Sequence, residues 1–137
     1  MTVELLVTGM LTGLIWVVQV VVYPGFLKVR DKWGEYHGDY MRRIGFVVMP
    51  LMLVELGMSG MRLILSREMI DGVLFGFVLA VWLTTFFLQV PAHRRLQNGW
   101  DGGQIRFLVG SNWIRTVLWT GRLVLLGVVL LDSMEAH

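Results

Sequence analysis

The sequence contains no cysteine, which excludes disulfide bonds, thiolate metal sites, iron–sulfur clusters and cysteine nucleophiles. Charged residues are also scarce. They make up 16% of the 137 residues, whereas a soluble domain carries roughly a quarter. The formal net charge of +2 is too small to neutralise many phosphates, so we expect no nucleic-acid partner. The remaining composition is 55% hydrophobic, which predicts that the protein lies in a lipid bilayer.

Four segments are apolar enough to cross a bilayer as helices. Such a helix needs about 20 predominantly apolar residues, because its backbone amides find no water in the hydrocarbon core. The predicted spans are residues 5–27, 44–65, 72–92 and 107–131. Short connections make consecutive helices antiparallel neighbours. We therefore predict one all-α integral membrane domain over residues 1–137, a four-helix up-down-up-down bundle.

The residues between the first two spans have helical character of their own. Trp33, His37, Tyr40 and Ile44 recur at helical spacing among charged residues. This pattern predicts either that the second helix is extended or that an amphipathic interfacial helix precedes it. After the third span, residues 98–103 have the composition of a turn, and Asp101 is placed to cap the fourth helix.

The distribution of basic residues predicts the orientation. Two arginines lie near the second connection, whereas eight basic residues lie near the first and third: Lys28, Arg30, Lys32, Arg42, Arg43, Arg94, Arg95 and Arg106. Because basic loops stay in the cytoplasm, we predict a plasma (inner) membrane protein with both termini outside the cytoplasm. All three tyrosines fall near the same predicted boundary, as in an aromatic belt.

Two charged residues lie at the depth of the bilayer interior. Glu55 is near the middle of the second span, and Arg122 is at comparable depth in the fourth. A charge there costs about 2.5–3.5 kcal/mol, so each needs a partner or a function. One interpretation is that the two form a buried ion pair. The alternative is that Glu55 is a proton carrier or a general base.

A second group of polar residues predicts a layer in the cytoplasmic half, to which each helix contributes: Gln19, Tyr23, His37, Tyr40, Gln89, His93, Asn112 and Arg115. Gln19 and Gln89 must find hydrogen bonds there. His37 and His93 come from different helices at similar depth. They are candidates for the axial ligands of one b-type haem, for metal ligands, for ordinary hydrogen-bonding histidines or for proton transfer.

The fourth span carries a stripe of polar and aromatic side chains. Asn112, Arg115, Trp119 and Arg122 fall on one helical face. Such a stripe suits an anionic or phenolate-bearing aromatic ligand, with arginine on the oxygen and tryptophan on the ring. Alternatively, Arg115 meets a lipid phosphate and Arg122 meets Glu55.

Four motifs together resemble those of the anthrone-oxygenase-like group of small four-helix membrane proteins. They are Gln-x-x-x-Tyr-Pro-Gly-Phe from Gln19, Met49-Pro50, Val-Pro-Ala-His-Arg-Arg-Leu from Val90, and Asn-Trp-Ile-Arg-Thr from Asn112. The resemblance covers nearly the whole chain in order and spacing. It implies a four-helix membrane fold and oxygenation of a polycyclic phenol without a metal.

We therefore expect an oxidoreductase or oxygenase-like protein acting on a hydrophobic aromatic or quinoid molecule in an interior polar pocket. The candidate catalytic residues are His37, Glu55, His93, Asn112 and Arg115. The candidate ligand-binding residues are Gln19, Tyr23, Tyr40, Gln89, Trp119 and Arg122. Either no cofactor is used or, as the second option, haem b binds between His37 and His93.

Two other functions fit the same pattern. The first is a non-catalytic accessory or assembly subunit that associates with other membrane subunits or with itself, and the second is electron transfer by a b-type haem protein. A channel or transporter ranks below these, because four helices with one central carboxylate, Glu55, make a pathway only on oligomerisation.

Overall fold

The computed structural model describes all 137 residues and contains four helical segments and no strands. The first segment comprises α1 (Thr2–Val17), the π turn η1 (Val18–Val22), α2 (Tyr23–Gly25) and the 3-10 turn η2 (Phe26–Lys28). The second is α3 (Trp33–Ser66). The third comprises α4 (Met69–Thr84), the π turn η3 (Thr85–Gln89) and α5 (Val90–Leu96), and the fourth is α6 (Gly102–Glu135). The predicted all-α four-helix bundle is confirmed, and all four segments are long and apolar enough to cross a membrane.

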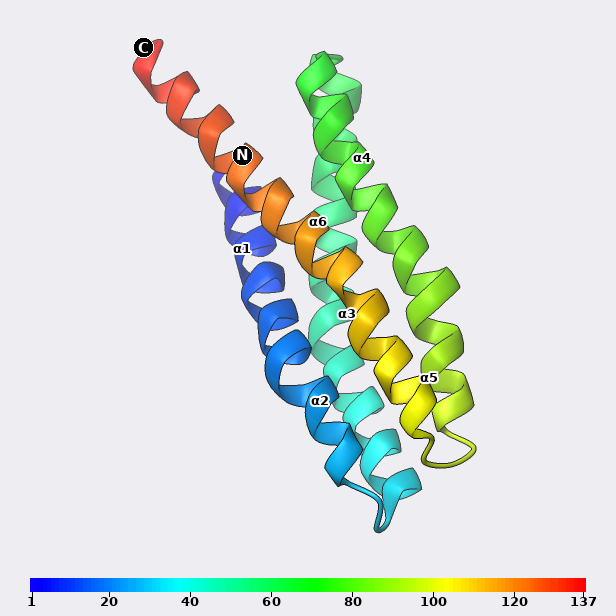
Figure 1. The fold of residues 1–137 in the computed structure, drawn as a ribbon. Helices are drawn as coiled ribbons and strands as arrows, with labels where there is room; N and C mark the ends of the chain where they lie inside the picture. Colours follow the sequence, from blue (N-terminus) through cyan, green and yellow to red (C-terminus); the bar gives the residue numbers. More distant parts are fainter.

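The four segments form a bundle in which consecutive segments are antiparallel (Figure 1). The backbone of α1 packs on α3 and α6, and the backbone of α4 packs on the same two helices. The termini and the connection between α3 and α4 lie toward one end (Figure 1), which we call the terminal end. The two remaining connections, residues 29–32 and 97–101, lie at the opposite end, which we call the loop end.

The helices are longer than the predicted spans, because polar turns extend each of them past its apolar core. The second helix begins at Trp33, so the extended helix is correct and a separate interfacial helix is not present. The fourth begins at Gly102, five residues before the predicted span. Asp101 caps it as predicted, since its Oδ1 accepts the backbone N–H groups of Gly103 at 2.8 Å and Gln104 at 3.2 Å.

Two π turns interrupt the first and third segments, and the sequence analysis did not predict them. Each π turn lies just before a proline. In the first, the N–H of Tyr23 donates to the carbonyl of Val18, and Pro24 follows. In the second, the N–H of Val90 donates to the carbonyl of Thr85, and Pro91 follows. A proline has no N–H to donate to the preceding helical turn, which favours a local change of hydrogen-bonding register. Each π turn carries one of the two buried glutamines, Gln19 in η1 and Gln89 in η3, so both turns direct a polar side chain into the bundle.

Candidate functional site

An ion network joins all four segments in the terminal half of the bundle. We define it as Glu4 and Thr8 of α1, Glu55 and Arg62 of α3, Asp71 of α4 and Arg122 of α6. The guanidinium of Arg122 is fully buried. Its Nη1 lies 3.0 Å from Glu55 Oε1 and also bonds Thr8, its Nη2 pairs with Glu4, and its Nε donates to the carbonyl of Leu74 at 3.2 Å.

Both carboxylate oxygens of Glu55 are occupied in this network. Oε1 accepts from Thr8 at 2.8 Å as well as from Arg122, and Oε2 accepts from the indole N–H of Trp119 at 3.1 Å. The ion pair of Glu55 with Arg122, one of the two interpretations from the sequence, is therefore present. A carboxylate held by three donors is poorly placed to act as a general base, so we assign Glu55 and Arg122 to structure.

Four members of the ion network were not predicted from the sequence: Glu4, Thr8, Arg62 and Asp71. Glu4 and Asp71 both lie within ion-pair distance of Arg62, at 3.3 Å and 3.1 Å. Each acidic residue stands in the first turn of an apolar helix and is buried, at 1% and 5% exposure. A carboxylate at the start of an apolar run was the available signal, but helix ends also attract charges that remain in water.

The predicted polar layer is assembled in the loop half of the bundle. Gln19 of η1 receives hydrogen bonds on its Oε1 from Asn112 Nδ2 at 2.9 Å and from the hydroxyl of Thr116 at 3.2 Å. Its Nε2 donates to the carbonyl of Val109 at 2.9 Å. Gln19 therefore links η1 to α6, and neither Gln19 nor Asn112 lines the cavity described below.

A chain of hydrogen bonds, which we call the relay, runs through Tyr23, His93 and His37. The Tyr23 hydroxyl lies 2.9 Å from His93 Nε2, and His93 Nδ1 lies 3.0 Å from His37 Nε2. Tyr23 also donates to Gln89 Oε1 at 3.2 Å. All three side chains are buried, and His37 Nδ1 at the far end has no hydrogen-bond partner. The relay thus has one free nitrogen at one end and a phenol at the other.

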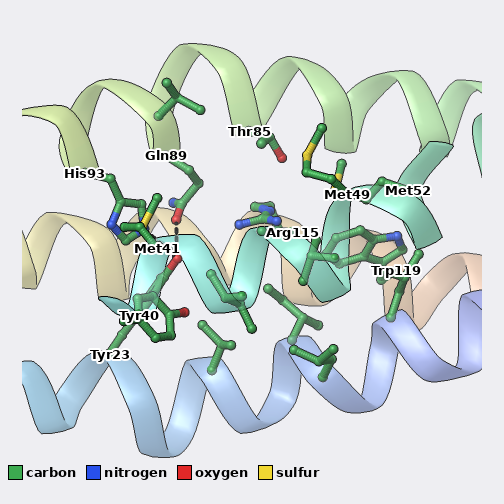
Figure 2. Close-up of a pocket in the computed structure, with 18 residues that line it drawn as sticks. Tyr23, Tyr40, Met41, Met49, Met52, Thr85, Gln89, His93, Arg115 and Trp119 are labelled. Carbon is green, nitrogen blue, oxygen red and sulfur yellow. Dashed lines mark hydrogen bonds between the residues drawn. The ribbon is translucent and has the colours of Figure 1, made fainter. Parts of the chain in front are cut away.

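The phenol end of the relay faces a cavity of about 180 Å³ between α3 and the other three segments. Eighteen residues line it and thirteen of them are hydrophobic. Figure 2 shows the polar ones pointing inward from opposite sides: Tyr23, Tyr40, Thr85, Gln89, His93 and Arg115. Trp119 adds its ring to the wall. Four elements, α2, η3, α5 and α6, therefore place five of the predicted site residues, together with Tyr40 of α3, around one apolar space.

Arg115 is the charged residue of this cavity. It is 7% exposed, and no carboxylate lies within ion-pair distance of it, in contrast to Arg122 and Arg62. The hydrogen bond that its Nη1 donates to Asn112 Oδ1 is long, 3.5 Å, and its Nε has no partner. Its guanidinium carbon lies 5.2 Å from the ring centre of Trp119. A buried cation without a counter-ion strongly favours an anionic ligand beside it.

The geometry of His37 and His93 does not fit axial haem ligation. Two imidazole nitrogens on one metal stand about 4 Å apart, twice a metal–nitrogen bond, with the porphyrin between them. Here the two nitrogens are 3.0 Å apart, and the rings stack with centroids 5.2 Å apart. No group of three or more metal-ligating side chains is present either. The residues present therefore do not fit a haem held between His37 and His93.

The predicted site residues thus divide into three groups. Tyr23, Tyr40, Gln89, His93, Arg115 and Trp119 line the cavity, Gln19, Asn112 and His37 lie behind it, and Glu55 and Arg122 belong to the ion network. The chain matches no protein-family model, no curated protein and no solved structure.

Proposed function

We propose that the protein is a membrane-embedded oxidoreductase or oxygenase-like protein that binds a hydrophobic phenolic or quinoid molecule in the cavity. The observation that carries this proposal is Arg115, a buried cation without a counter-ion in a mostly apolar space next to the relay. A phenolate supplies both the negative charge that Arg115 lacks and an apolar ring that suits the rest of the cavity. Its oxygen pairs with the guanidinium of Arg115, and its ring meets apolar side chains and the indole of Trp119.

The relay supplies a route for the phenol proton. Tyr23 accepts a proton from the substrate hydroxyl as it passes its own to His93 Nε2. His93 Nδ1 then passes a proton to His37 Nε2, and His37 Nδ1, which has no partner within the protein, releases one to water at the loop end. Each group gives up one proton as it receives another, so no member of the relay is left charged. The transfer starts from the tautomer in which His93 Nε2 and His37 Nε2 are unprotonated. It ends with His93 Nε2 donating to Tyr23 and Tyr23 donating to Gln89, which is the arrangement in the structure. A proton must therefore return through His37 Nδ1 before the next substrate is deprotonated.

Proton removal prepares the substrate for oxidation, because a phenolate gives up electrons more readily than a phenol. The resemblance to the anthrone-oxygenase-like group supports dioxygen as the oxidant. The residues in this proposal bind, deprotonate and hold the substrate: Arg115 stabilises the oxyanion, the relay removes the proton, and Asn112 positions Arg115.

The test uses 4-nitrophenol, whose phenolate and phenol forms differ in visible absorbance, and the protein in lipid nanodiscs. We expect the wild type to bind it as the phenolate. Arg115→Met should weaken binding about 10- to 100-fold, since a hydrogen bond to a charged group contributes about 1.5–3 kcal/mol. The probe still bound should be the neutral phenol. Oxygen uptake with electron-rich phenols, measured on the same two proteins, tests the oxidation step.

The control is Arg94→Met, because Arg94 is exposed at the loop end and outside the cavity. It should bind 4-nitrophenolate within about twofold of the wild type, because exposed charges are screened by salt. Equal losses in the two variants would show that general surface charge, and not the cavity, attracts the probe. Binding of the neutral form by the wild type would also refute the proposal.

We further propose that the loop end faces the cytoplasm, with both termini on the opposite side of the plasma (inner) membrane. The basic residues near the 29–32 and 97–101 connections support this orientation. The chain has no native cysteine, so Asn98→Cys and Glu135→Cys each introduce a single reactive thiol. In intact cells, a membrane-impermeant maleimide should label the cysteine at 135 and leave the one at 98 unlabelled. The reverse pattern would invert the topology.

A further inference from the structure

Resting on the proposed function, we propose that the ligand is a phenol or quinone with a single-ring head that carries an apolar chain, and that this chain leaves the cavity along α3 into the bilayer. The inference narrows the substrate class. A compact polycyclic phenol, which the resemblance implies, is not the molecule that this cavity takes. Three observations support the narrower class: the size of the cavity, its open rim on α3, and the apolar chemistry of that rim.

The size of the cavity limits the head. Its volume of about 180 Å³ is close to that of an engineered protein cavity of about 150 Å³ that binds benzene. One substituted ring therefore fills the space beside Arg115 and Trp119. A fused three-ring system is too large to be enclosed, and it would force apart side chains in a packed interior.

The cavity is not closed on the side of α3. Met41, Ile44, Gly45 and Val48 line it and are partly exposed, and Met49 is 39% exposed. The backbone explains the gap, since α5 and both π turns pack on α6 while α3 packs on α1 and α4. Gly45 widens the opening further, because a Cβ added there would meet no atom within 4 Å.

The chemistry of the rim indicates what passes through it. The rim residues on α3 from Met41 to Met49 are methionine, isoleucine, glycine and valine, and none carries a polar side chain. Tyr40, directly before them, is also partly exposed and adds the one hydroxyl on this side. The other polar groups of the lining lie on α2, η3, α5 and α6 (Figure 2). A ligand whose ring and oxygen lie beside Arg115 therefore projects its remaining atoms through an apolar opening on a membrane-spanning helix. Only an apolar chain is compatible with that path and with the lipid beyond it.

The experiment compares three probes in nanodiscs of one lipid composition, with affinity expressed per mole of probe in the bilayer. They are 4-nitrophenol, the same molecule with an eight-carbon chain at position 2, and 1-hydroxyanthraquinone. We expect the first two to bind the wild type within about twofold of each other, because the chain stays in an apolar environment in both states. The three-ring probe should bind at least about tenfold more weakly.

A plugged opening tests the path of the chain. Gly45→Phe should weaken binding of the chain-bearing probe about tenfold more than binding of plain 4-nitrophenol. Gly57→Phe is the matched control, because Gly57 is also on α3 with open space at its Cβ but lies outside the cavity. It should affect neither probe.

The outcomes separate this inference from the function on which it rests. A tenfold loss of affinity on adding the chain, equal binding of the three-ring probe, or equal effects of Gly45→Phe on both nitrophenols would overturn the chain-bearing ligand while leaving phenolate binding at Arg115 intact. Failure of the wild type to bind any of the probes as an anion would overturn the proposed function, and this inference with it.

Discussion

Arg122→Met is expected to lower the free energy of unfolding by about 3–5 kcal/mol, the loss typical of removing one partner from a buried ion pair. The fully buried guanidinium of Arg122 contacts Glu4, Thr8 and Glu55, together with a backbone carbonyl of α4. Its removal leaves two buried carboxylates without their main counter-charge. The four segments also lose the side chain that joins α1, α3, α4 and α6 in one place.

Thermal and denaturant unfolding in one detergent measure this loss. Arg106→Met is the control, because Arg106 is exposed on the same helix, and its change should stay within about 0.5 kcal/mol. The double variant Glu55→Gln with Arg122→Met should be more stable than Arg122→Met alone, because one stranded charge is gone. A loss below about 1 kcal/mol in the single variant would mean that the ion network contributes little to stability.

His93→Phe is expected to slow proton transfer to and from a bound phenol by about 10²- to 10⁴-fold, the usual contribution of a positioned acid–base group. His93 is the central member of the relay, bonded to Tyr23 at 2.9 Å and to His37 at 3.0 Å. Phenylalanine keeps a flat ring of similar size between them but has no nitrogen to accept or donate a proton. The route from the cavity to His37 Nδ1 is then broken.

A rapid pH jump on the nanodisc protein with bound 4-nitrophenol separates rate from affinity. The amplitude of the absorbance change reports how much phenolate is bound, which depends on Arg115. The time constant reports the relay. His137→Phe, at the exposed C-terminal residue, should change neither. If His93→Phe lowers only the amplitude and leaves the time constant within twofold of the wild type, the proton takes another route.

The sequence predicted the architecture because hydropathy and segment length are properties of the chain alone. Four apolar runs with short connections allow few arrangements in a bilayer, where every backbone amide must bond within its own helix. The stripe on α6 was predicted from helical spacing, which is also a property of the chain alone. The structure buries all four of its residues: Asn112, Arg115, Trp119 and Arg122. The same depth argument placed Gln19 near Asn112 and His37 near His93.

The tertiary structure decided which polar residues pair and which remain free. Arg115 and Arg122 stand two turns apart on one face of α6, and helical spacing alone does not show which of them meets a counter-ion. Packing places four hydrogen-bond acceptors from other helices around Arg122 and an apolar cavity beside Arg115. Neighbours from distant parts of the chain set the partners of a buried charge, so helical periodicity shows which face it occupies but only the packed bundle shows whether a counter-ion meets it there.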